Sequence, residues 1–244
     1  MKSLKNAGMA VLLSLTLFSC EEVDGIWTET GLTNDEIVNG LKTALEVSTD
    51  TSVTILSEAN GYYNDALVKI LLPSEASVLV NNITKIPGGQ LLLDNTIQAI
   101  NRSAEDAAPQ AADIFKTAIT GMTINDGLAI LSGSDSAASH YLRQNTSQNL
   151  YNAFKPNIQA SLSKKLIGNL SAESAYADLI DKYNVVAKAS FGVLKPITTN
   201  SLSEHTTNKA LNGLFEKVKL EEGKIRNDVS HRVNDILKKV FEEK

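Results

Sequence analysis

Apolar residues recur every three or four positions along most of this chain, which is the spacing of one face of an α-helix. Thr33-Asn34-Asp35-Glu36 has the form of a capping box, in which threonine and glutamate side chains bond the free N–H groups of a first helical turn. Apolar residues follow at 37, 41, 44 and 45. The pattern predicts a first helix that begins here, although the polar run at 49–52 is a possible interruption.

The same periodicity predicts further helices, each bounded by glycine, proline or a capping residue. Residues 73–86 read as one helix, which Pro87-Gly88-Gly89 ends. Residues 135–154 read as a longer helix that stops before Pro156, because a residue that precedes proline disfavours the α conformation. The remaining expected helices cover 91–108, 109–121, 123–131, 158–167, 171–189, 202–222 and 229–241.

One stretch alone, ALVKILLP at 66–73, has a strand-like composition. It is short and has no second β-run to pair with, so we expect it to be helix or extended linker. No internal repeat of fixed period is present. We therefore predict an all-α fold: a single multi-helix globular domain of about nine or ten helices over residues 32–244.

Near the start of the chain, Lys2 and Lys5 precede an apolar run from about Met9 to Phe18. As a helix this run would reach only about 15 Å, roughly half of a bilayer core, so it is too short to span a membrane. Basic residues, a short apolar run and a small residue before a break are typical of a secretory signal peptide. Residues 17–20, Leu-Phe-Ser-Cys, resemble a bacterial lipobox, in which the signal is removed before the cysteine and the cysteine receives lipid.

This interpretation divides the chain into a lipoprotein signal peptide at 1–19, a lipidated Cys20 with an acidic tether at 20–31, and the helical domain. It predicts a lipid-anchored protein of the bacterial cell envelope, at the outer membrane, facing either the periplasm or the cell surface. The alternative is an ordinary secreted protein with a stray thiol. Lipidation explains the lone cysteine better, because it leaves no reactive thiol unpaired.

Composition narrows the classes of function. The formal net charge is −5 and no basic cluster occurs, which argues against nucleic acid as a partner. With one cysteine in the sequence, disulfides, thiol redox chemistry and cysteine-ligated metal are excluded for the domain. Aromatic residues make up only 5% of the chain against 43% apolar in total, so the core must be mainly aliphatic.

Three stretches of the domain resemble the bacterial family called domain of unknown function 4197. They are 101–109 (NRSAEDAAP), 122–133, and the C-terminal 206–241, in which apolar residues lie along the helical faces. The resemblance covers nearly the whole mature chain. It implies a secreted or lipid-anchored helical protein, and brings no established activity, cofactor or catalytic residue. This chain has Asp228-Val229 where the family tends to have Asn-Pro, so a continuous helix through 228 is also allowed.

The densest polar cluster of the domain contains Glu221, Glu222, Arg226 and Arg232. One interpretation places its carboxylates beside its guanidinium groups in a cleft, where they would do acid/base chemistry or bind an anion. The other is that Glu222 with Arg226, and Asp228 with Arg232, are i,i+4 ion pairs on a solvated helix face.

A second polar cluster contains Asn101, Arg102 and Glu105, and its first and last members share a helical face flanked by alanines. Small residues allow helices to cross closely, and polar side chains at such a crossing need partners. We expect a structural network that clasps the C-terminal helices, with a ligand site as the alternative.

Recognised catalytic and metal-binding spacings are missing from the sequence. His140, His205 and His231 fit no ligand motif, and no serine nucleophile, P-loop or dinucleotide fingerprint is present, so no metal and no cofactor is expected. The favoured function is a lipid-anchored envelope protein whose helical domain binds a partner protein or a small ligand, without identifiable catalysis. The alternatives are an envelope hydrolase that uses carboxylates near Glu105, Glu221 and Glu222, and a purely structural lipoprotein.

Overall fold

A computed structural model describes residues 32–198 and 202–241 of the chain. Within these residues the regular elements are helices, together with one isolated β-bridge between Ile167 and Leu170. The predicted all-α fold is confirmed. The predicted signal peptide, Cys20 and the tether lie outside the described residues. None of the described helices combines the length and the apolar character that crossing a bilayer requires.

Most connections between the helices are short, but residues 58–73 separate α1 from the first 3₁₀ turn. The α-helices are α1 (Asn34–Ser57), α2 (Ser77–Asn81), α3 (Gly89–Ala107), α4 (Ala111–Thr120), α5 (Ile124–Leu131), α6 (Ala137–Ser163), α7 (Ala172–Ala189), α8 (Leu202–Asn227) and α9 (Asp235–Phe241). Four 3₁₀ turns separate some of them: η1 (Ser74–Ala76), η2 (Ile83–Lys85), η3 (Ala108–Gln110) and η4 (Val229–His231).

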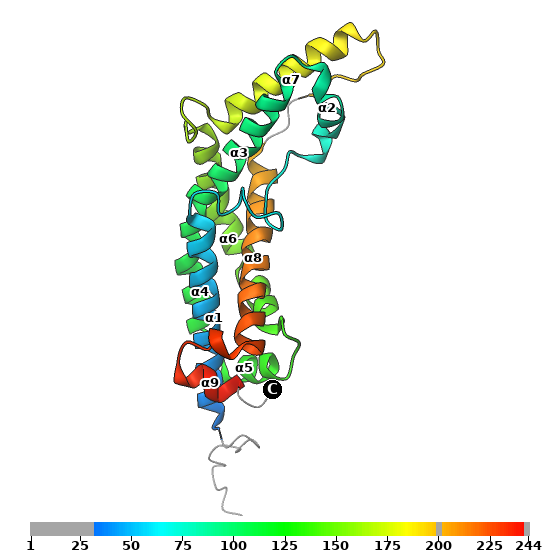
Figure 1. Cartoon of the computed structure of the whole chain (residues 1–244). Coiled ribbons are helices and arrows are strands. Elements are labelled where there is room, and N and C mark those ends of the chain that lie inside the picture. The colour runs from blue at the N-terminus through cyan, green and yellow to red at the C-terminus, as the bar shows by residue number, and fades with distance from the viewer. Residues whose placement is uncertain (1–31, 199–201, 242–244) are drawn as a thin grey trace, which may run out of the picture.

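The domain is elongated (Figure 1). Helix α8 packs along both α6 and α1, and α4 packs against α1 and α6. Helix α3 continues the bundle beyond them by packing against α6 and α7. At the opposite end, α5 and α9 pack against α1. The first and last described helices therefore meet at one end of the molecule, and the end of α7 projects at the other.

Helix α1 begins at the predicted capping box. The Thr33 hydroxyl accepts a hydrogen bond from the Glu36 N–H at 3.2 Å, and the Glu36 carboxylate accepts one from the Thr33 N–H at 2.9 Å. The polar run at 49–52 does not interrupt the helix. The hydroxyls of Thr49 and Ser52 donate to the carbonyls of Leu45 and Ser48, so these buried polar groups are satisfied inside the helix.

The predicted helix end at residue 154 is wrong, because α6 continues through Pro156 to Ser163. Proline removes one helical N–H and crowds the carbonyl four residues earlier. Here Pro156 is exposed, whereas Phe154 and Ile158 on either side are fully buried. Packing of the buried face on both sides of the proline holds the helix together. Residues 158–163 of the expected separate helix are therefore the last part of α6, and residues 164–167 are not helical.

The predicted single helix over 73–86 is also wrong, because this stretch forms η1, α2 and η2 in succession. Its buried residues Ala76, Leu79, Ile83 and Ile86 are three or four positions apart. Short 3₁₀ turns place residues three apart on one side, as an α-helix does, so the spacing alone does not distinguish the two.

The C-terminal region breaks at residue 228, and α9 begins only at Asp235. The Asp228 carboxylate accepts a hydrogen bond from the Ser230 N–H at 2.9 Å, which turns the chain into η4 instead of into a helix that starts at 229. Aspartate bonds the backbone two residues on in such turns. The continuous helix that Val229 would allow is therefore not formed.

Candidate functional site

The structure gives the two predicted polar clusters different surroundings. On α3, Asn101 is fully buried and faces the extended stretch that follows the turns after α1. Its side-chain oxygen accepts a hydrogen bond from the Ile70 N–H at 2.9 Å, and its amide nitrogen donates to the Ile70 carbonyl at 2.8 Å. Ile70 is buried and lies outside any helix or strand, so its N–H and carbonyl have no partners in regular secondary structure. The Asn101 side chain provides both hydrogen bonds.

Glu105 lies one turn further along α3 and holds the start of the same segment. Its carboxylate accepts hydrogen bonds from the N–H groups of Tyr62 and Tyr63 at 3.3 and 3.4 Å, and pairs with Arg102 at 2.7 Å. Glu105 is only 4% exposed, whereas the Arg102 side chain is 23% exposed. We call residues 62–70 the clasped segment, since Asn101 and Glu105 hold its two ends.

Tyr62 connects this hydrogen-bond network to α8. Its hydroxyl donates to the Ala210 carbonyl at 2.9 Å, and burial, together with the nearby Glu105 carboxylate, raises the pKa of the hydroxyl, so it remains a donor. Asp65 in the same segment pairs with Lys217 of α8. The expected clasp of the C-terminal helices is therefore indirect: α3 holds the clasped segment, and the clasped segment contacts α8.

The second cluster lies at the end of α8, beside the start of α6. The Glu222 carboxylate accepts hydrogen bonds from the N–H groups of Ala138 and Ser139 at 3.1 and 2.8 Å, and from the Ser139 hydroxyl at 2.5 Å. These are the second and third residues of α6, whose own N-cap residue, Ser136, makes no capping bond. A carboxylate from α8 therefore caps α6, where the N–H groups and the helix dipole favour negative charge.

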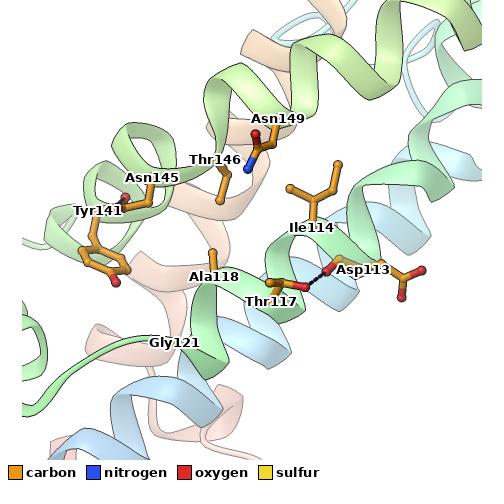
Figure 2. A pocket seen from close by; sticks show the side chains of 9 residues that line it. All are labelled: Asp113, Ile114, Thr117, Ala118, Gly121, Tyr141, Asn145, Thr146 and Asn149. Atoms are coloured by element: carbon orange, nitrogen blue, oxygen red, sulfur yellow. Dashed lines mark hydrogen bonds between the residues drawn. The ribbon is translucent and has the colours of Figure 1, made fainter.

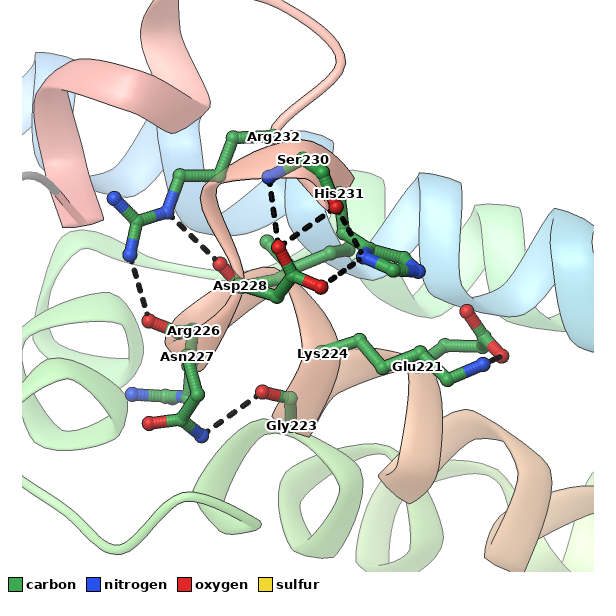
Figure 3. A network of polar contacts seen from close by, with 10 residues as sticks. Glu221, Gly223, Lys224, Arg226, Asn227, Asp228, Ser230, His231 and Arg232 are labelled. Atoms are coloured by element: carbon green, nitrogen blue, oxygen red, sulfur yellow. Dashed lines mark hydrogen bonds and ion pairs between the residues drawn. The ribbon is translucent and has the colours of Figure 1, made fainter.

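Arg226 and Arg232 complete this cluster. Arg226 pairs with Glu222 at 2.9 Å in the predicted i,i+4 register, but both side chains are buried instead of solvated. Arg232 donates to the carbonyls of Ile225 and Arg226 at 3.1 and 2.8 Å, which satisfies the C-terminal end of α8. Figure 3 shows Arg232 beside this helix end, with Asp228 turned toward Ser230 and His231. The expected ion pair between Asp228 and Arg232 is not formed.

Glu221 has a different environment from its neighbour Glu222. It pairs with Lys224 at 2.7 Å, and the lysine side chain is 48% exposed (Figure 3). Ala210, which Tyr62 contacts, and Glu222 are roughly 18 Å apart along α8, at about 1.5 Å per residue. The carboxylates of Glu105, Glu221 and Glu222 are therefore not brought together in one cleft.

A groove between α4 and α6 offers a more open surface (Figure 2). Its volume is about 570 Å³, which is within the range of small-ligand pockets. On the α4 side the lining is lowest at Ala118 and at Gly121, the residue that follows the helix. The α6 wall carries polar side chains. The full lining is Asp113, Ile114, Thr117, Ala118, Gly121, Tyr141, Asn145, Thr146 and Asn149.

Hydrogen-bond partners differ along the α6 wall. The Asn145 amide donates to the Tyr141 carbonyl at 2.8 Å, whereas the Asn149 side chain makes no hydrogen bond to any residue that the structure describes. At the α5 end, the Tyr141 hydroxyl lies 3.5 Å from the Asp126 carboxylate. Hydrogen bonds from Thr123 lower the pKa of Asp126, and burial raises the pKa of Tyr141, so an aspartate anion and a neutral phenol stand at this end.

The sequence did not indicate this groove. Asn145 and Asn149 are four residues apart on a helix, which is equally typical of a solvated face, and the α4 side is a mixture of charged, apolar and small residues without a recognisable pattern. The histidines lie apart: His140 is exposed, His205 contacts the Leu71 carbonyl and His231 pairs with Asp228. Across residues 32–198 and 202–241, no group of three or more acidic, histidine or cysteine side chains is arranged to hold a metal ion.

Comparison with known proteins places most of the chain in one family. The model of a family described as "Protein of unknown function (DUF4197)" matches residues 31–242. Searches of curated proteins and of solved structures gave no match.

Proposed function

Because the chain belongs to the DUF4197 family, whose description names no activity, we propose a function from its own residues. The protein is a lipid-anchored domain of the bacterial cell envelope that binds a segment of a partner protein in the groove between α4 and α6. The observation that carries this proposal is the groove itself, in which Ala118 and Gly121 leave room beside α4 while the α6 side presents amide and hydroxyl groups.

The chemistry of the groove favours a protein segment as the occupant. Neutral amides and hydroxyls bind the backbone and polar side chains of a peptide without requiring charge. Ala118 and Gly121 allow a bound backbone to approach α4 closely. Exposed Asp113 at one end favours a partner segment that carries a basic residue there.

The polar clusters support binding in preference to catalysis. A general acid or base must reach a substrate proton within hydrogen-bond distance. The Glu222 carboxylate instead bonds the first turn of α6, and the Glu105 carboxylate bonds the clasped segment, both while buried. These groups stabilise the domain that presents the groove.

The groove is tested by site-specific photo-crosslinking in intact cells. A photoreactive amino acid at Asn149, inside the groove, is expected to give one discrete protein adduct. The same residue at Gln148, the exposed neighbour outside the lining, serves as the control. Thr117→Trp, which fills the groove from an exposed position, should remove the adduct. Equal adducts from 148 and 149, or an adduct that survives Thr117→Trp, would contradict the proposal.

The anchor is tested separately. The full chain should incorporate labelled fatty acid, and Cys20→Ala should lose both the label and membrane attachment. Label retained in Cys20→Ala would show that the lone thiol is not the lipid acceptor. Crosslinking at Asn149 is read independently of this result, so failure of the anchor and failure of the groove are distinguishable.

A further inference from the structure

The loop that follows α7 presents two apolar side chains directly to solvent. Phe191 is 99% exposed and Val193 is 82% exposed. Single exposed apolar residues are ordinary, but these two are separated only by Gly192, in the loop that follows the projecting end of α7 (Figure 1). We call residues 190–194 the α7 tip.

The backbone of the α7 tip is held in an unfavourable conformation. Phe191 has a φ of +53° and Gly192 a φ of +90°. For a residue with a bulky side chain, the left-handed region costs about 1–2 kcal/mol, so glycine would suit position 191 better than phenylalanine. A strained residue persists only where the surrounding structure fixes it, and such residues concentrate at functional sites.

Side chains of α7 fix the returning chain. Asn184 makes two hydrogen bonds with the backbone of Ile197, at 2.8 and 2.9 Å. The Tyr183 hydroxyl donates to the Lys195 carbonyl at 3.0 Å, and the Ser190 hydroxyl accepts from the Leu194 N–H at 2.8 Å. The tip is therefore a preorganised protrusion.

The segment that forms the tip carries charge of the opposite sign to that of the whole chain. The chain has a net charge of −5, yet residues 183–198 contain Lys188 and Lys195 and no acidic residue. Both lysines are exposed, and neither pairs with an acid among the described residues. A protruding aromatic residue with flanking cations has the chemistry of an interfacial membrane anchor, in which the ring enters the headgroup region and the ammonium groups meet anionic lipid.

We propose that the α7 tip inserts Phe191 and Val193 into the interface of an anionic lipid bilayer. A second copy of the chain fits less well, because a two-fold contact between tips would bring the lysines of both copies together. The inference does not depend on the lipid at Cys20, since the tip lies at the end of the domain opposite the start of α1.

The test places an environment-sensitive fluorophore at the tip of the full chain. Cys20→Ala removes the natural thiol, and Val193→Cys provides the labelling site. Vesicles that contain phosphatidylglycerol should shift the emission to the blue, and nitroxide-labelled lipid should quench it. The matched control is Val185→Cys, 68% exposed on α7 before the tip, where neither change is expected.

Further variants separate insertion from a structural role. Phe191→Gly relieves the backbone strain, so it should keep or raise the Tm while abolishing the shift at residue 193. Lys188→Gln and Lys195→Gln should each weaken binding to anionic vesicles about fivefold. No shift at 193, an equal shift at 185, or a shift that appears without vesicles and grows with protein concentration would overturn the proposal. The last result would assign the tip to a second copy.

Discussion

The cluster on α3 and the cluster at the end of α8 both supply hydrogen bonds to buried backbone groups that would otherwise lack partners. The first does so for an irregular segment, and the second for helix ends. Asn101 and Glu105 hold a segment that has no repeating hydrogen bonds of its own. Glu222 and Arg232 hold the ends of helices, where only the terminal groups lack partners. Both clusters contain an ion pair, but Glu105 pairs with an arginine that is 23% exposed, whereas both side chains of the Glu222–Arg226 pair are buried. Removing one side chain should therefore reduce the free energy of unfolding by different amounts in the two clusters.

The largest effect is expected from Glu222→Ala. The substitution removes the cap of α6 and leaves the buried Arg226 guanidinium without its counter-charge, at a cost of about 3–5 kcal/mol in the free energy of unfolding. Urea unfolding followed by circular dichroism measures it. Glu221→Ala is the control, because its partner Lys224 is half exposed, and should cost about 1 kcal/mol or less. Similar losses for the two variants would contradict the assignment of Glu222 as the cap.

A smaller and more local effect is expected from Asn101→Ala. It leaves the buried N–H and carbonyl of Ile70 without partners, which should cost about 2–3 kcal/mol. Amide hydrogen exchange should accelerate at Ile70 before it accelerates in α6 or α8. Asn157→Ala is the matched control, since that amide bonds only the Ala153 carbonyl of its own helix. Uniform acceleration throughout the domain would show that Asn101 supports the whole core and not the clasped segment.

The smallest effect on stability is expected from removing the Asp65–Lys217 ion pair, which joins the clasped segment to α8. The hydrogen bond from Lys217, reinforced by the Leu67 N–H, lowers the pKa of Asp65 against a smaller opposing effect of burial. A lowered pKa in the folded state gives stability that is present above the unfolded pKa, near 3.9, and is lost as the pH falls through the folded pKa. Asp65→Asn should therefore flatten the fall in urea midpoint with pH below about 4. An unchanged slope in Asp65→Asn would contradict the role assigned to this ion pair.

Local patterns were enough to predict much of the fold. The capping box at Thr33 uses residues three positions apart, so the sequence shows both partners together. The cap of α6 could not be found in this way, because Glu222 follows Ser139 by more than eighty positions and only packing of α8 against α6 joins them. The cluster around Glu222 was recognised as polar, but its burial depends on this packing.

The helix boundaries that were predicted wrongly also depend on packing between distant parts of the chain or on an ambiguous local pattern. At Pro156 a local rule predicted a helix end, and the buried residues on either side outweighed it. At 74–86 the apolar spacing was read correctly, but it fits 3₁₀ turns as well as an α-helix. Sequence reasoning found which residues are buried more reliably than it found which backbone conformation buries them.

The meeting of α1 and α9 at one end of the domain has a consequence for engineering the chain. Gly40 of α1 packs so closely against Val240 of α9 that an added Cβ would lie 2.4 Å from the valine methyl group. The first and last described helices are thus closely packed against each other. A circular permutant could therefore join the two ends of the fold by a short linker. New termini opened in the loop between α7 and α8 would then lie at the far end of the molecule, on the side of the α7 tip.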